Sequence, residues 1–282
     1  MLSVRFWGVR GSIPCPGPDT VIYGGNTSCL EIRADGRLII IDLGTGVRPL
    51  GDWLVENDLK TNGKIKADIF LTHTHWDHIM GFPMFNPIYM PGTELHITAP
   101  DTMNKESLKS IIETQLSPQF WPVKADELAA SIKYAQIKET VLDLGDGLTI
   151  STKYLNHPIS CLGYRVNFKG KSIATVYDHE HYRGNDAAEK ENEKIREFIK
   201  GADIVIHDAH YTQNEYDKHS GWGHCSQESA VNAASGINVK KIVLFHHEPS
   251  HTDSIMNQLA QKFAGNSNPV VLIAKEGMTL EA

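Results

Sequence analysis

The chain has 282 residues, of which 41% are hydrophobic and 22% are charged, the balance of an ordinary globular protein. Its net charge of −7 provides no basic field for a large nucleic acid, and no apolar run approaches the roughly 20 residues of a membrane helix. The four cysteines are widely spaced and form no CxxC pair, which argues against a disulfide framework or a structural zinc ribbon. The first residues contain no apolar stretch of signal-peptide length, so we expect a cytoplasmic protein.

Short runs rich in β-branched and aromatic residues predict strands along most of the chain. These runs are residues 3–7, 28–33, 37–42, 67–71, 94–99, 148–155, 163–168, 172–177, 202–207, 241–245 and 269–274. Asp35-Gly36 lies between the second and third runs and predicts a hairpin there.

Two helices are predicted from their end signals. The first covers residues 186–200, with Asp186 as its N-cap and Gly201 just past its end. The second begins after Ser226 as N-cap and stops before Gly236. Both lie between predicted strands, so strands and helices alternate in this half of the chain.

The middle of the chain gives weaker signals. Residues 104–116 have a helical pattern, and residues 120–134 contain aromatics and prolines that suggest a cover over another part of the protein or a surface for a partner. No long linker, low-complexity segment or short repeat interrupts the sequence. We therefore expect one domain over residues 1–282, in which two β-rich halves carry helices on the outside.

The stretch THTHWDH, residues 72–78, directly follows a predicted buried strand. Because side chains alternate along an extended stretch, His73 and His75 point the same way, whereas Asp77 and His78 come as the chain turns. Neutral imidazoles and carboxylate oxygens are ligands that divalent transition metals prefer. The crowding of these groups predicts a metal site, and a solvated polar loop is the alternative.

THTHWDH resembles the HxHxDH signature of the metallo-β-lactamase fold superfamily, and further features occur in the expected order to about residue 250. IIIDLGTG looks like the early strand whose final Asp supports the metal loop; NHPIS, TVYDHE and LFHHEP follow, each with a candidate ligand. The resemblance implies the fold class α/β (α+β), as a four-layer αββα sandwich. It implies two divalent metal ions, held by His73, His75 and His157 at one site, by Asp77, His78 and His246 at the other, and bridged by Asp178.

Three of these assignments have alternatives in the sequence alone. His157 precedes a proline in a polar stretch and could be a surface histidine. Asp178 has other polar neighbours that could replace it as the ligand. His246 is followed by His247, and its position straight after a strand favours His246 without deciding between them.

The implied metal pair, ~3.5–4 Å apart, would hold a bridging water or hydroxide, and this predicts hydrolysis. Zinc suits the nitrogen and oxygen ligand set, with manganese and iron as alternatives. Redox chemistry is disfavoured because flavin-linked di-iron members of the superfamily carry Glu where this chain has His75.

Two further stretches, IHDAHYT at 206–212 and GHCSQESA at 223–230, are similar to the ribonuclease Z branch. There an acidic residue pairs with a histidine; here they would be Asp208 and His224, acting as a proton donor for a leaving alkoxide. The branch usually has Glu at the position of Asp208, and a solvent-facing His224 is the alternative reading. The opening FWGVRGSIPCPGP resembles members described as cyclic-nucleotide-phosphodiesterase-like.

Arg10 and the glycine-rich turn at 23–29 are candidate phosphate contacts, although a role in the fold would explain both equally well. Ribonuclease Z proteins carry a glycine- and proline-rich arm for tRNA, and no such insertion occurs between Ser172 and Ile206.

We therefore expect a dinuclear phosphodiesterase acting on a small phosphodiester, such as a cyclic nucleotide or short oligonucleotide, with Asp77, Asp208 and His224 as catalytic residues. The alternatives are a thioester or lactam hydrolase, a tRNA 3′-processing endonuclease and a non-catalytic metal-stabilised binding module. A homodimer is a further expectation from related enzymes.

Overall fold

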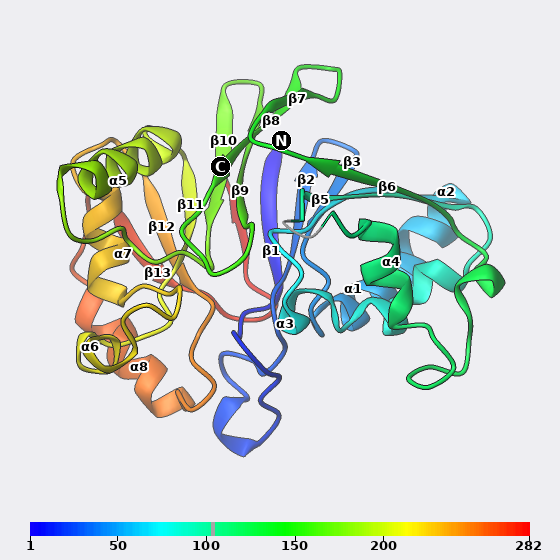
Figure 1. Cartoon of the computed structure of the whole chain (residues 1–282), viewed down its shortest axis with the longest axis horizontal. Coiled ribbons are helices and arrows are strands. Elements are labelled where there is room, and N and C mark those ends of the chain that lie inside the picture. Colours follow the sequence, from blue (N-terminus) through cyan, green and yellow to red (C-terminus); the bar gives the residue numbers. More distant parts are fainter. Residues whose placement is uncertain (103–104) are drawn as a thin grey trace.

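The structure is a computed structural model that describes residues 1–102 and 105–282. In this part of the chain two seven-stranded sheets lie side by side in the middle of the molecule (Figure 1). The strand order of the first sheet is β14 (Thr279–Glu281), β1 (Leu2–Gly8), β2 (Cys29–Ala34), β3 (Arg37–Ile41), β4 (Ile65–Phe70), β5 (Thr93–Pro100) and β6 (Ser131–Ile137). The order of the second is β13 (Val270–Ile273), β12 (Lys241–Phe245), β11 (Ile204–Asp208), β10 (Lys171–Val176), β9 (Leu162–Phe168), β8 (Leu148–Tyr154) and β7 (Val141–Asp143).

Helices cover the outer face of each sheet (Figure 1). On the first sheet they are α1 (Val47–Leu54), the π-helical turn η2 (Val55–Leu59), α2 (Lys60–Asn62), α3 (Trp76–Ile79), η3 (Phe82–Met84), η4 (Asn86–Tyr89), α4 (Leu108–Thr114) and η5 (Ala125–Glu127). On the side of the second they are α5 (Asp186–Ile199), α6 (Gln213–His219), α7 (Gln227–Ala234) and α8 (Asp253–Phe263). The short helix η1 (Pro18–Thr20) belongs to the N-terminal loop.

Strand β3 shows how the sequence builds the layers. Its apolar residues are all buried because both of its faces are covered. Ile39 and Ile41 face the second sheet, whereas Leu38 and Ile40 pack against the helices. The same division gives one apolar cluster between the sheets and one outside each sheet. This confirms the predicted four-layer αββα sandwich of the α/β (α+β) class.

Each predicted strand run overlaps an observed strand, and the Asp35-Gly36 hairpin joins β2 to β3. The segment at 120–134 is not only a cover, because it leads into β6, the edge strand of the first sheet. Within the predicted helix at 104–116 the structure has α4, while residue 104 lies outside the described residues. The sequence analysis missed the edge strands β6, β7 and β14 and the helices α1, α6 and α8.

The caps of the two predicted helices can be compared directly. Ser226 caps α7, as predicted, and its side chain accepts a hydrogen bond from the Ser229 amide. The N-cap of α5 is Asn185 and not Asp186, because the Asn185 side chain accepts from the amides of Ala187 and Ala188. Both Asn and Asp are good N-caps, so the prediction was one residue off.

Parallel pairing determines where the loops lie. Strands β3, β4, β5 and β6 run parallel in one sheet, and β10, β11, β12 and β13 run parallel in the other. The loops after β4, β10 and β12 and the last residue of β11 carry most of the predicted site residues, whereas His157 follows β8 and His224 precedes α7. Parallel strands therefore bring these segments, far apart in sequence, to the carboxyl ends of their sheets.

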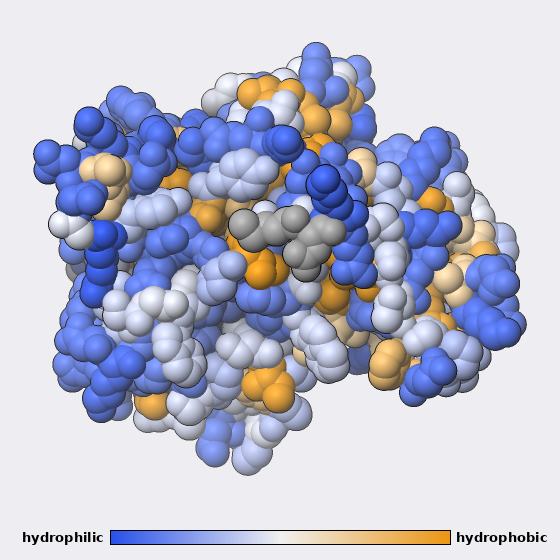
Figure 2. All heavy atoms as spheres, in the orientation of Figure 1, coloured by the Kyte–Doolittle hydropathy of each residue, from blue (hydrophilic) through white to orange (hydrophobic). Residues whose placement is uncertain are grey.

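The surface visible in Figure 2 is mostly hydrophilic, with apolar residues in separate small patches. Among the described residues, no helix is both long enough and apolar enough to cross a bilayer.

Asp203 connects the amino-terminal ends of three parallel strands of the second sheet, β10, β11 and β12, at the end of the sheet away from the predicted site. It directly precedes β11, its Oδ2 accepts from the Ser172 amide of β10 at 2.8 Å, and its Oδ1 accepts from Lys240 at 2.6 Å and Lys171 at 3.5 Å. Burial alone would raise the pKa of Asp203, but the hydrogen bonds and the two lysine charges outweigh burial and lower it. The ionised carboxylate is therefore the form that the folded state stabilises.

We expect Asp203→Asn to lower the free energy of unfolding by about 1 kcal/mol at pH 7, because the charged hydrogen bonds become neutral. Since the folded-state pKa lies below the unfolded value of roughly 3.9, this contribution is present above about pH 4 and disappears as the pH falls through the folded pKa. Urea unfolding of both proteins from pH 7 downwards measures the difference. A difference that does not shrink in acid would contradict this account.

Candidate metal centre

The backbone is strained at three strand ends that surround the site. Asp42 follows β3, Asp178 follows β10 by two residues and His246 follows β12, with φ values of 64°, 57° and 61°. Non-glycine residues seldom adopt positive φ, and such strain collects at functional sites. At each position the chain leaves its strand sharply and turns a polar side chain toward the space at the sheet ends.

Asp42 organises the THTHWDH loop from behind. It accepts hydrogen bonds from the Thr72 amide at 2.7 Å, from the Thr72 hydroxyl at 3.0 Å and from His78 Nδ1 at 2.8 Å. Because Nδ1 of His78 faces the Asp42 carboxylate, it carries a hydrogen, and Nε2 is the nitrogen turned toward the other candidate ligands. The sequence suggested that this aspartate supports the metal loop. In the structure it does so by orienting His78.

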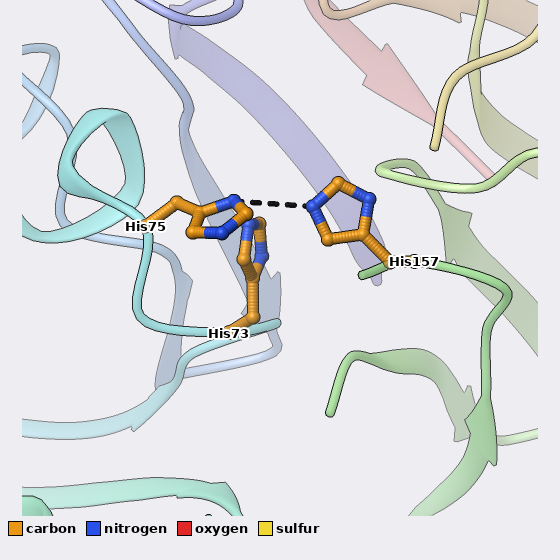
Figure 3. A group of neighbouring side chains, drawn as sticks. All are labelled: His73, His75 and His157. Atoms are coloured by element: carbon orange, nitrogen blue, oxygen red, sulfur yellow. Dashed lines mark hydrogen bonds between the residues drawn. The ribbon is translucent and has the colours of Figure 1, made fainter. Parts of the chain in front are cut away.

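His73, His75 and His157 form the first group of ligand-capable atoms, all within 4.8 Å of one another. Figure 3 shows the three rings, two from the loop after β4 and one from the loop after β8. Nε2 of His157 lies 3.1 Å from Nδ1 of His75. The side chain of His157 is almost fully buried, so it is not the surface histidine that the sequence left open.

Asp77, His78 and His246 form the second group. Nε2 of His78 lies 3.2 Å from Oδ2 of Asp77 and 3.3 Å from Nε2 of His246. Oδ2 of Asp77 also accepts a hydrogen bond from the Ser12 amide at 2.8 Å, so the N-terminal loop helps to hold this group. His247 points elsewhere, with Nε2 on the carbonyl oxygen of Ala274 at 2.8 Å.

Asp178 stands between the two groups. Its Oδ1 lies 3.8 Å from Nε2 of His73 and from Nε2 of His157. Its Oδ2 lies 3.2 Å from Nε2 of His78 and 3.3 Å from Nε2 of His246. One carboxylate thus faces each group with a different oxygen, which is the arrangement of a bridging ligand.

The donor set fits two divalent cations. Nε2 of His73 and Oδ2 of Asp178 are buried and make no hydrogen bond within the described residues, which is costly unless another group binds them. Burial lowers the pKa of His157 to about 4 and that of His73 well below its usual value, so both imidazoles are neutral and offer lone pairs. Neutral imidazole with carboxylate is the chemistry of a transition-metal site.

Asp208 and His224 form a hydrogen-bonded pair beside the second group. Nδ1 of His224 lies 2.8 Å from Oδ2 of Asp208, and the His224 side chain is only 11% exposed, so it does not face solvent. Burial alone would lower the pKa of His224, but the Asp208 carboxylate raises it to about 9. His224 therefore carries a proton at neutral pH.

Glu180 holds the loop that presents His224, a role that the sequence analysis missed. Its carboxylate accepts from the Gly221 amide at 2.8 Å, the Gly223 amide at 3.0 Å and the Tyr216 hydroxyl at 2.9 Å. The sequence showed only that Glu180 lies in the polar stretch after Asp178, which gives no hint of a partner 43 residues away.

Arg10 is a structural residue and not a phosphate contact. It is completely buried, with hydrogen bonds to the carbonyl oxygens of Gly24 at 2.8 Å and His251 at 2.7 Å. The glycine-rich turn is also used internally: Asn26 binds Glu276, and the Thr27 amide donates to the Thr45 hydroxyl at 2.9 Å. Of the two roles that the sequence left open, phosphate contact and support of the fold, Arg10 and the glycine-rich turn both have the second.

A cleft of about 1010 Å³ lies away from this centre. Its lining includes Arg37, Lys66, Asp68 and Glu94, on or beside the starts of β3, β4 and β5, and none of the predicted site residues. Acidic and basic side chains are mixed there, so the cleft has no charge pattern that favours an anion.

Known proteins share this fold and parts of the sequence. A ribonuclease Z of Lactococcus lactis subsp. lactis (strain IL1403) is 24% identical over 239 residues, 69% of this chain and 75% of that protein. A ribonuclease Z of Staphylococcus aureus (strain Newman) is 22% identical over 310 residues, covering 95% of each.

Among solved structures, the metallo-beta-lactamase fold protein YhfI from Bacillus subtilis aligns with a TM-score of 0.70 at 17% identity, covering 100% of this chain and 99% of that one. The short form of human tRNase Z aligns with a TM-score of 0.65 at 19% identity, covering 99% and 98%. These likenesses show the fold.

Residues 37–247 match the Beta-lactamase superfamily domain, most of the chain. Together with the four-layer sandwich and the clustered histidines and aspartates, this match identifies the protein as a member of the β-lactamase superfamily, a metal-dependent hydrolase of the metallo-β-lactamase fold in the ribonuclease-Z-like branch.

Proposed function

We propose that this protein is a dinuclear phosphodiesterase. In this proposal two divalent cations are held by His73, His75 and His157, by Asp77, His78 and His246, and by Asp178 between them. The observation that carries the proposal is the Asp208–His224 pair, 2.8 Å apart, placed beside the second ligand group. A buried, charged proton donor is what an alkoxide leaving group requires.

When bound, the two cations supply a water of lowered pKa and positive charge for the phosphoryl oxygens. Zinc is the cation that we propose, with manganese and iron as alternatives for the same donors.

The chain's own residues account for the rest of the reaction. Asp77, fixed by the Ser12 amide, accepts a hydrogen bond from the attacking water in addition to its ligand role. Asp208 keeps the hydrogen of Nδ1 on His224, so Nε2–H of His224 faces the leaving oxygen. The water releases one proton, through Asp77 to solvent; as its oxygen bonds to phosphorus, the bond from phosphorus to the leaving oxygen breaks and His224 gives that oxygen its proton. The products are an alcohol and a phosphomonoester.

For the substrate we propose a small phosphodiester, a cyclic nucleotide or a short oligonucleotide. Between Ser172 and Ile206 the described chain forms β10, a loop and α5, with no arm that could hold a tRNA. The net charge of −7 also disfavours a large polyanion. We further propose a single domain over residues 1–282 and, since the four cysteines are free thiols, a cytoplasmic location.

A second candidate is tRNA 3′ processing. It is favoured by one observation, the alignment with ribonuclease Z of Staphylococcus aureus over 95% of both chains. A panel that contains a precursor tRNA, a dinucleotide, cyclic nucleotides, a thioester and a lactam separates these functions. A precursor tRNA cleaved far better than every small diester would replace our first proposal, and turnover of only the thioester or lactam would remove both.

The ligand assignment predicts different behaviour for two adjacent histidines. We expect His246→Gln to lose at least one of the two metals, because Nε2 of His246 faces Asp178 Oδ2 at 3.3 Å. The matched control His247→Gln should keep both, since the His247 side chain is turned to the Ala274 carbonyl and not to the ligand groups. Metal content per chain after gel filtration, by plasma mass spectrometry, measures this. Equal losses in the two variants would count against the assignment.

The role of His224 predicts a dependence on the leaving group. We expect His224→Asn, whose amide can still donate to Asp208, to lower kcat by about 10²–10⁴-fold for a diester with an alkoxide leaving group. For a nitrophenyl diester the loss should be below about tenfold, because nitrophenolate leaves without a proton. Both metals should be retained. A uniform loss on the two substrates would show that His224 is not the proton donor.

A further inference from the structure

His210 is a third imidazole at the proton-donor pair, and neither the metal groups nor the proposed reaction uses it. Its ring stacks on His224, with centroids 4.5 Å apart and an interplanar angle of 21°. It also lies 5.3 Å from the ring of His246, and ligand-capable atoms of the three histidines are within 4.8 Å of one another. The residue itself is 3% exposed, so its position is set by the protein.

The hydrogen bonds of His210 determine which of its nitrogens can accept. Nδ1 lies 2.7 Å from the carbonyl oxygen of His246, and a carbonyl can only accept, so Nδ1 carries the hydrogen. Nε2 of His210 is then a lone-pair acceptor. Within the described residues it has no hydrogen-bond partner, and unlike Nε2 of His73 it is not sealed from solvent.

Gly11 packs against the rings of His210 and His246. A Cβ at Gly11 would lie 2.5 Å from Cε1 of His246 and 2.9 Å from Cε1 of His210, closer than side chains approach. The absence of a side chain at Gly11 lets the N-terminal loop press on both imidazoles. His210 is therefore fixed by the His246 carbonyl, by His224 and by Gly11, as a group that binds a substrate must be.

The two stacked imidazoles offer complementary hydrogen bonds. His224 donates from Nε2, because beside the Asp208 carboxylate its imidazole is protonated on both nitrogens, whereas His210 accepts at Nε2. We propose that His210 accepts a hydrogen bond from a hydroxyl vicinal to the leaving oxygen, so that the enzyme selects leaving groups that are one half of a vicinal diol. The ribose of a ribonucleotide, leaving through O3′ with its 2′-hydroxyl beside it, has this chemistry, and so does the glycerol of a glycerophosphodiester.

This inference rests on the proposed phosphodiesterase reaction and adds to it a preference for leaving groups that carry a vicinal hydroxyl. Water releases one proton, through Asp77 to solvent, and its oxygen attacks phosphorus. The bond from phosphorus to O3′ breaks, the His224 proton moves to O3′, and the 2′-hydroxyl keeps its own proton while donating to His210. The products from a dinucleotide are a nucleoside with free 2′- and 3′-hydroxyls and a nucleoside 5′-phosphate. A 2′-deoxy or 2′-O-methyl leaving group cannot donate this hydrogen bond.

The test uses the metal-loaded full chain and three uridylyl-(3′→5′)-uridines that carry hydroxyl, hydrogen or O-methyl at the 2′-position of the leaving nucleoside. We expect kcat/KM for the hydroxyl substrate to exceed that of the other two by about 10- to 100-fold. The same comparison of kcat/KM between glycero-3-phosphocholine and its analogue without the vicinal hydroxyl shows whether the preferred leaving group is glycerol or ribose.

Two variants separate binding from folding. His210→Asn keeps a donor toward the His246 carbonyl but removes the acceptor at Nε2, so the preference for the 2′-hydroxyl should fall below about threefold while both metals are retained. His210→Gln places an amide oxygen near the position of Nε2 and should retain part of the preference. An unchanged preference in His210→Asn, or loss of metal in both variants, would overturn the inference. No cleavage of any diester by the wild-type protein would instead overturn the proposed function.

Discussion

The geometry of the whole centre depends on the way in which the parallel strands of two facing sheets end. Strands β3 and β4 of one sheet and β10, β11 and β12 of the other deliver their loops to the same region. Asp42, Asp178 and His246 then leave their strands with positive φ, which turns their side chains inward. Strain of this kind costs of order 1–3 kcal/mol per residue and persists only where the surrounding fold enforces it. The large apolar cluster between the sheets provides that enforcement.

Burying so many polar groups together makes the centre unstable on its own. Seven ligand-capable side chains meet at His73, His75, Asp77, His78, His157, Asp178 and His246, and most are sealed from water. Imidazole nitrogens of the ligand groups lie 3.1 and 3.3 Å apart beside buried carboxylates, and Nε2 of His73 and Oδ2 of Asp178 have no hydrogen-bond partner among the described residues. Cations resolve both problems, since they bind the lone pairs and neutralise the carboxylates. If the proposed metals bind here, their binding would stabilise the folded state at this end of the sandwich.

The sequence predicted the features that local pattern determines. Alternating and continuous apolar runs identified the long strands, and the THTHWDH spacing identified one loop of the centre. It could not decide between His246 and His247, because that choice depends on a backbone twist at the end of β12 and on the carbonyl of Ala274, which only the tertiary structure supplies. Edge strand β7 was missed because it is three residues long and mostly exposed. Glu180 and His210 were overlooked because their partners lie 43 and 36 residues away in the chain.

Asp208 joins the metal centre to the proton donor. Its Oδ2 accepts from the Asp178 amide at 3.0 Å and from His224 at 2.8 Å, while its Oδ1 accepts from the Cys225 amide at 2.9 Å and the His210 amide at 3.2 Å. The bonds from Glu180 to the amides of Gly221 and Gly223 hold the His224 loop against the Asp208 carboxylate. Because the same carboxylate positions Asp178, His210 and His224, the distance between the ligand groups and the leaving-group side of the pocket is set by one residue. In the proposed reaction a substitution at Asp208 would therefore change the alignment of nucleophile, phosphorus and leaving oxygen together, and not the acidity of His224 alone.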